Sequence, residues 1–272
     1  MKTIKIQGKK VAEIYMSYGD CSLINNPDKF SASLITEEIA NITSDIGFGN
    51  REELINFVRD FILGDSKEKP CELEYHERKI MEVIKKTLSH CLSVFEEEVI
   101  KIFIFPTIDD FSINKMGGVN GFCVSQNVMF IGLFPTKGWG EDLMKTIAHE
   151  LAHALSPSYD MEKMTLGEGL IFEGVAEHFR EKFIGGKQSS WSSAISRNEA
   201  REIFNQLKKE LDHGEIKLYT EVFYGTGKYP LWSGYTIGYY ILEDYLKKLN
   251  KIDWRKIISA NPKKILKESG WL

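Results

Sequence analysis

The sequence predicts an α+β protein with a small mixed β-sheet and many helices. Two segments rich in β-branched and aromatic residues, 99–108 ("VIKIFIFPTI") and 127–134 ("NVMFIGLF"), have the composition and partial alternation of strands. Elsewhere apolar residues recur at helical spacing between capping residues and glycines. The sequence pattern changes from helical to strand-like near residue 95. We therefore expect a mostly helical N-terminal region, residues 1–95, and a second region, residues 96–272.

The N-terminal region is expected to contain two helices after an irregular start. Asn50 can cap the pattern "REELINFVRDFIL", and Gly64 follows its end. A longer helical pattern, "ELEYHERKIMEVIKKTLSHCLSVF", runs from Glu72 to Phe95. This region resembles no family that we can name.

The second region is expected to begin with its two strands, separated by a loop at "GGVNGF", residues 117–122. Helices are expected next, because each segment has helical periodicity and a plausible stop signal. They lie at 141–156, 168–184, 196–212 and 234–249, with a short last helix that opens at Asn261-Pro262.

Charge, hydropathy and cysteine usage narrow the class of protein. The 272 residues carry a net charge of −4, without the basic excess of a nucleic-acid-binding protein. The first twenty residues contain no unbroken apolar stretch of the signal-peptide kind. The longest uncharged run, 116–136, is rich in glycine and suits a loop and strand better than a membrane span. The four cysteines show no CxxC pair, which favours reduced thiols. We expect a cytoplasmic protein with no nucleic-acid or membrane partner.

A potential metal site lies in "TIAHELAHAL", residues 146–155. Successive residues of an α-helix are about 100° apart, so His149 and His153 lie one turn apart on the same side. Glu150 lies on that side too, offset from the two histidines. The other half of the helix is apolar and contains Leu143, Met144, Ile147, Ala148, Leu151, Ala152, Ala154 and Leu155. The pattern predicts a buried helix that directs three polar side chains toward one metal ion.

These residue types suit zinc chemistry. Two neutral imidazoles bind Zn²⁺ and leave positions for a third protein ligand and a water. Zinc lowers the pKa of such a water toward about 7. The offset carboxylate of Glu150 is suited to accept the water's proton and to pass it to a leaving amine. We therefore expect one Zn²⁺ per chain, with His149 and His153 as ligands and Glu150 as general base.

A third ligand is expected within "LGEGLIFEGVAEHFREKF", residues 166–183. The candidates are Glu168, Glu173, Glu177 and His178. Glu173 and Glu177 are neighbours one helical turn apart, but that spacing is equally compatible with two solvated carboxylates. His178 is turned away from Glu173 and suits a partly buried helix histidine better. Spacing alone leaves the choice open.

The combined motifs resemble the gluzincin metallopeptidases, in which HExxH is followed about twenty residues later by E-G-x-A on a second helix. "FEGVAEHF" matches, with nineteen residues between His153 and Glu173. The block from Gly117 to Leu249 is more similar still to the bacterial YjaZ-type family of predicted zinc-dependent proteases. The resemblance implies that Glu173 is the third zinc ligand and that Glu177 orients a ligand imidazole. It also implies a zincin-like metallopeptidase fold for residues 96–272.

The same resemblance draws attention to a tyrosine-rich helix. Aminopeptidase N-like gluzincins carry a Y-x-x-G motif some sixty residues after the third ligand, and its tyrosine stabilises the oxyanion. The segment Tyr235-Thr236-Ile237-Gly238 matches, 62 positions after Glu173. The resemblance therefore implies that Tyr235 is catalytic, with Tyr239 as the second choice. Core packing is the other explanation for tyrosines on such a helix.

The segment before the HExxH helix bears on the substrate. In gluzincins a peptide substrate pairs with an edge strand at this place in the chain, which is strand addition. Aminopeptidases of the similar branch carry G-x-M-E-N there, and its Glu holds a free amino terminus. No Glu occurs between Met116 and Thr136, which favours an endopeptidase over an aminopeptidase.

Two other classes of function are compatible with these motifs. One is a regulatory protein that binds zinc without turnover, and the other is a zinc hydrolase with a non-peptide substrate. Glu150 favours an enzyme over a regulatory protein, because zinc binding without catalysis does not need it. We expect a peptide or protein substrate, and the oligomeric state stays open.

Overall fold

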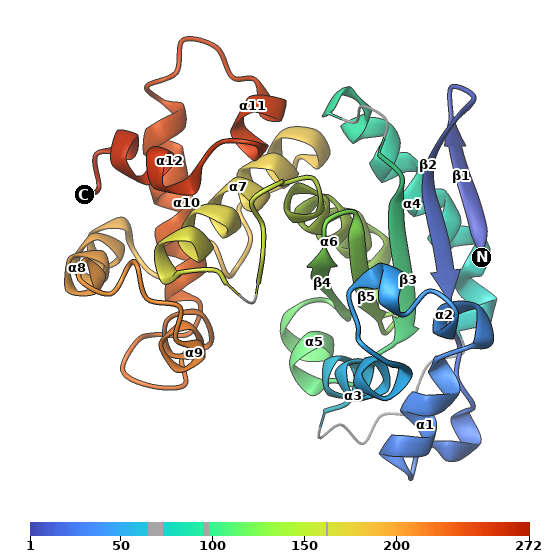
Figure 1. Cartoon of the computed structure of the whole chain (residues 1–272). Coiled ribbons are helices and arrows are strands. Elements are labelled where there is room, and N and C mark those ends of the chain that lie inside the picture. The colour runs from blue at the N-terminus through green and yellow to red at the C-terminus, as the bar shows by residue number, and fades with distance from the viewer. Residues whose placement is uncertain (65–72, 95–97, 162) are drawn as a thin grey trace. The chain divides into compact units, whose positions relative to one another are not determined.

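The structure is a computed structural model and describes residues 1–64, 73–94, 98–161 and 163–272 (Figure 1). The chain divides into two compact units, Met1–Ala154 and Leu155–Leu272. The first is an α/β unit and the second is helical. None of the helices in the described ranges has both the length and the apolar composition to cross a bilayer.

The first unit is built on one mixed sheet. Among the described residues it has five strands in the order β1-β2-β3-β5-β4. The strands are β1 (Lys2–Ile6), β2 (Lys9–Met16), β3 (Ile100–Pro106), β4 (Val119–Ser125) and β5 (Val128–Leu133). The inner three run parallel, whereas β1 and β4 pair antiparallel with their neighbours. The expectation of a small mixed sheet in an α+β protein is confirmed.

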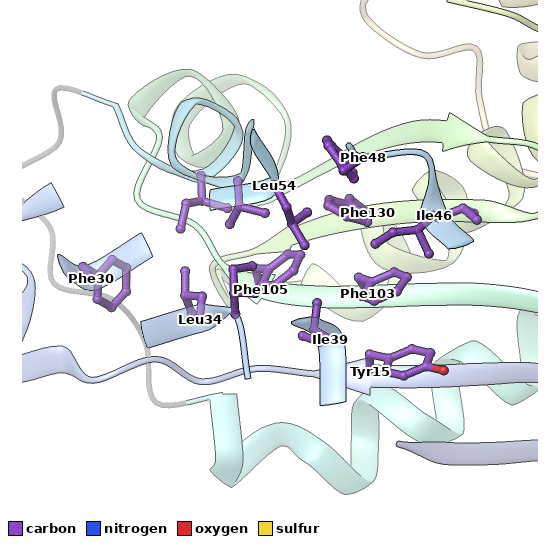
Figure 2. Packing of buried hydrophobic residues seen from close by; sticks show 14 residues of the cluster. Tyr15, Phe30, Leu34, Ile39, Ile46, Phe48, Leu54, Phe103, Phe105 and Phe130 are labelled. Atoms are coloured by element: carbon purple, nitrogen blue, oxygen red, sulfur yellow. The ribbon is translucent and has the colours of Figure 1, made fainter. Parts of the chain in front are cut away.

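Helices cover this sheet. They are α1 (Pro27–Leu34), α2 (Glu37–Ala40), α3 (Arg51–Ile62), α4 (Glu77–Cys91), α5 (Asp110–Lys115) and α6 (Trp139–Ala154). Residues of α1–α3 form a buried cluster with Phe103, Phe105 and Phe130 of the strands (Figure 2). Because side chains alternate along a strand, the intervening residues of β3 and β5 face the opposite side. α6 contacts β4, β5 and α4.

The N-terminal region differs from the expectation of an irregular start. Residues 2–16 form the β1–β2 hairpin, and β2 pairs with β3 from Ala12↔Ile100 to Met16↔Ile104. Four of the eight β2 residues are buried: Val11, Ala12, Ile14 and Tyr15. Buried and exposed residues therefore alternate only weakly, and two lysines begin the strand. The expected boundary at residue 95 lies outside the described residues. The strands β2 and β3, which lie before and after that boundary in the chain, nevertheless pair with each other.

Both helices expected in the N-terminal region are confirmed. α3 begins after Asn50, whose side-chain oxygen accepts a hydrogen bond from the Glu53 amide at 2.9 Å. α4 lies inside the pattern that was expected to run from Glu72 to Phe95, and those two end residues lie outside the described part of the chain. The expected loop at 117–122 is only partly a loop, because β4 begins at Val119.

The second unit consists of helices. They are α7 (Leu166–Ile184), α8 (Arg197–Leu207), α9 (Ile216–Tyr224), α10 (Ser233–Leu246), α11 (Trp254–Ile258) and α12 (Pro262–Ser269). The expected helices are confirmed, and two were missed, α9 and α11. The α9 sequence "IKLYTEVFY" is rich in β-branched and aromatic residues, and Glu215 at its start makes no side-chain cap.

α7 and α10 cross at two glycines, Gly174 of the E-G-x-A segment and Gly238 of the Y-x-x-G segment. A Cβ added at Gly174 would lie 2.2 Å from the Gly238 carbonyl oxygen. A Cβ added at Gly238 would lie 2.0 Å from the Leu170 carbonyl oxygen. Any side chain at either position would push the helices apart. These glycines therefore set how closely the helix of Glu173 approaches the helix of Tyr235.

Candidate metal centre

The two histidines of the HExxH motif meet at one point on α6. Their Nε2 atoms are 3.3 Å apart, and the rings meet at 73°. Both side chains are buried. Two nitrogens that bind one tetrahedral zinc at about 2.0–2.1 Å lie about 3.3–3.4 Å from each other. The separation of the pair therefore fits a shared zinc ion.

The rest of the first unit holds α6 in this orientation. Leu143, Ile147 and Leu151 of its apolar half are fully buried, as the sequence predicts. At its C-terminal end, the amide of Asn127 in the β4–β5 turn donates to the Ala154 carbonyl at 2.9 Å. Rotation of α6 would expose the apolar half, so the histidines are held on the opposite side.

Glu150 is buried on the same helix, with 7% of its surface exposed. Its carboxylate lies close to β4, because a Cβ built on Gly121 would be 2.8 Å from Glu150 Oε1. The carboxylate thus lies between the helix that carries the histidine pair and the strand at the edge of the described sheet. A carboxylate is held there at a fixed place.

Glu168 and Glu173 have different surroundings on α7. Glu168 forms a capping box with Thr165: its Oε2 accepts from the Thr165 amide at 2.9 Å, and its own amide donates to the Thr165 hydroxyl. That carboxylate is used to begin the helix. Glu173 lies in the middle of α7 and is buried.

His149, His153 and Glu173 are all buried. Imidazole and carboxylate donors of this kind are those of catalytic zinc sites. The histidines belong to the first unit and Glu173 to the second. That Glu173 is the third ligand stays a prediction.

Glu177 anchors a segment that follows α7. Its two oxygens accept hydrogen bonds from Trp191 Nε1 at 2.8 Å, Arg180 Nη2 at 2.7 Å and Ser192 Oγ at 3.2 Å. Arg180 also donates to the carbonyls of Gly185 and Lys187. The pair is fully buried, so it ties residues 185–192 to α7. A role for Glu177 beside a ligand imidazole stays a prediction.

Tyr235 lies near the charge of Glu173. Burial raises the pKa of its phenol well above the usual value, and the neighbouring Tyr224 and the Glu173 carboxylate raise it further. Tyr235 contacts the edge of the Phe223 ring at 5.1 Å. The phenol is therefore neutral near pH 7 and keeps its proton for donation.

Tyr239 and His178, the weaker candidates, are bound to other groups. The Tyr239 hydroxyl donates to Glu181 at 3.2 Å, and its ring stacks on that of His178 at 4.2 Å. The Nε2–H of His178 donates to the Tyr239 carbonyl at 3.0 Å. Burial lowers the pKa of His178 to about 4. These three contacts fix the packing of α7 on α10.

Comparison with known protein families identifies the chain. Residues 80–267 match the family described as "Predicted Zn-dependent protease (DUF2268)". The match covers more than half of the 272 residues, so the chain belongs to this family of predicted Zn-dependent proteases. No curated protein and no solved structure matches it. The resemblance to zinc-dependent proteases that the motifs indicate is confirmed.

The buried ion pair between Arg180 and Glu177 yields the first prediction. Replacement Arg180→Met leaves a buried carboxylate without its cation, which costs about 3–5 kcal/mol in the free energy of unfolding. Urea denaturation followed by circular dichroism measures this loss. The matched control is Arg78→Met, since Arg78 is 92% exposed and pairs with the exposed Glu82. That variant should lose less than about 1 kcal/mol. Equal losses of unfolding free energy in the two variants would contradict a stabilising role for the buried pair of Arg180 and Glu177.

Proposed function

We propose that the protein is a zinc-dependent endopeptidase with a zincin-like fold. In this proposal His149, His153 and Glu173 bind one Zn²⁺ per chain, Glu150 is the general base, and Tyr235 stabilises the oxyanion. The observation that carries it is the buried histidine pair, with Nε2 atoms 3.3 Å apart, in a chain of a predicted Zn-dependent protease family.

The choice of Glu173 as third ligand has three supports. Glu168 is occupied by the capping box at the start of α7, and Glu177 is bound to Arg180, Trp191 and Ser192. Glu173 is buried in the middle of the helix. The E-G-x-A motif of the gluzincins places the ligand at the same residue.

Each residue then has one task in the hydrolysis of an amide. When bound, zinc supplies Lewis acidity, which polarises a carbonyl and acidifies water. Glu150 accepts the proton of the attacking water and delivers it to the amine that leaves. Tyr235 donates its hydroxyl proton as a hydrogen bond to the negative oxygen of the transition state, where the raised pKa keeps the phenol protonated.

The sheet offers a place for an extended peptide. β4 pairs with β5 and lies at the edge of the described sheet, next to Glu150. Addition of a substrate strand there would present a backbone amide near the proton acceptor. No carboxylate occurs in β4 to hold a free amino terminus, which favours internal bonds. We also propose that the protein works in the cytoplasm, where its free cysteines would stay reduced.

Metal content is the first test of this proposal. His153→Ala and Glu173→Gln should each abolish stoichiometric zinc, because a site with two protein ligands binds far more weakly. Elemental analysis of protein purified without added zinc measures it. Glu168→Gln is the matched control on the same helix and should keep zinc. If Glu168→Gln loses zinc and Glu173→Gln keeps it, the third ligand is wrong.

Catalysis is the second test. Glu150→Gln is nearly isosteric and should keep zinc, but turnover should fall by roughly 10²–10⁴, the usual contribution of a positioned general base. Cleavage of a mixed peptide library by zinc-loaded wild type and variant measures the difference. Equal cleavage would rule out the mechanism. If wild type cleaves nothing while it binds zinc, a regulatory zinc protein or a non-peptide hydrolase replaces the proposal.

The oxyanion role of Tyr235 is tested by kinetics. Tyr235→Phe should keep zinc and lower kcat with KM nearly unchanged, because the phenol acts on charge that forms in the transition state. Tyr239→Phe is the control on the same helix, since the Tyr239 hydroxyl binds Glu181. A Tyr235→Phe enzyme as fast as wild type would reduce Tyr235 to a packing residue.

A further inference from the structure

β4 has no side chain at the point where Glu150 of α6 meets it. Gly121 lies between Val119 and Cys123 on one face of the strand, by the alternation of a regular strand. A Cβ built on Gly121 would lie 2.6 Å from Glu150 Cγ and 2.7 Å from Thr146 Cγ2. Real Cβ atoms do not approach other carbons so closely. The space over Gly121 is therefore filled by two side chains of α6.

A second observation places the Glu150 carboxylate over the same face. The pKa of the Cys123 thiol is raised well above its usual value, first by burial and then by the negative charge of Glu150. Cys123 is two residues beyond Gly121 along β4. The carboxylate is thus within electrostatic reach of the next inward-facing side chain on the strand.

Backbone conformation does not explain the glycine. Gly121 is absent from the glycines with positive φ in the described chain. It pairs regularly with Ile131 of β5 in the antiparallel ladder. Glycine in the interior of a strand is otherwise unfavourable and often marks close approach by another group. Here the approaching group is the side chain of Glu150.

We propose that Gly121 is a positioning residue for Glu150. Because Gly121 has no side chain, it leaves the space against β4 that the Glu150 carboxylate occupies. This inference rests on the proposed function, in which Glu150 accepts the proton of the attacking water. The side chain of Thr146, one turn before Glu150 on α6, fills the rest of the space over Gly121. A methyl group at residue 121 would displace the carboxylate or lift α6 from the strand.

Kinetics of the zinc-loaded full chain tests the catalytic consequence. Gly121→Ala should lower kcat about 10²-fold, the effect of a displacement near 1 Å, while zinc content stays unchanged and KM stays within about twofold. The control is Gly140→Ala at the start of the same helix. Its nearest neighbour would be Lys79 Cε at 3.3 Å, the end of a flexible side chain, so its kcat should equal that of wild type. An unchanged kcat for Gly121→Ala would overturn the proposal.

Thermal unfolding tests whether Gly121 makes room for the Glu150 side chain, without any need for activity. Gly121→Ala should lower Tm by roughly 2–10 °C in wild type, as expected for an overpacked contact. In a Thr146→Ser/Glu150→Ala background, which removes the three crowded atoms, the same change should cost much less. If Gly121→Ala alone does not fold, the triple variant should fold. Equal losses in both backgrounds, or a triple variant that does not fold, would contradict the inference.

The two tests separate the two claims. A wild type that cleaves no peptide would refute the proposed function, and the comparison of Tm values would still decide whether Gly121 makes room for Glu150. A wild type that cleaves peptides while Gly121→Ala remains fully active would keep the proposed function and refute the positioning role.

Discussion

The burial of one side of α6 is the constraint on which the candidate centre depends. Leu143, Ile147 and Leu151 are fully buried, and rotation of the helix would expose them. The same constraint holds His149 and His153 on the other side, where a spacing of four residues brings their nitrogens to 3.3 Å. The apolar residues thus fix the side chains of the candidate metal site without taking a chemical part in it.

Close approach of backbones and side chains is the second theme of the molecule. Gly174 and Gly238 allow α7 and α10 to cross closely, because each glycine lies against the backbone of the other helix. Gly121 gives β4 the space that Glu150 occupies. In each case a Cβ would lie under 3 Å from its neighbour, so these glycines are explained by space and not by flexibility.

α7 shows how surroundings separate residues of the same type. Glu168 caps the helix, Glu177 anchors the following segment through Arg180, and Glu173 lies buried between them. Each of these three carboxylates has different surroundings, so their chemical roles differ although all are glutamates of one helix. The buried pair of Glu177 and Arg180 ties the following segment to α7, which suits a helix that we propose to supply a metal ligand.

The sequence by itself determined the helix type and the polar side of α6, because a period of 3.6 residues needs no partner to be recognised. It also indicated the family, because motif spacing is local along each helix. It did not determine the β1–β2 hairpin or its pairing with β3, since strand partners are distant along the chain and alternation in β2 is weak. Only the tertiary structure decided that Glu173 is buried, and why residue 121 is glycine. Those outcomes depend on atoms of other elements, whose distances no local pattern contains.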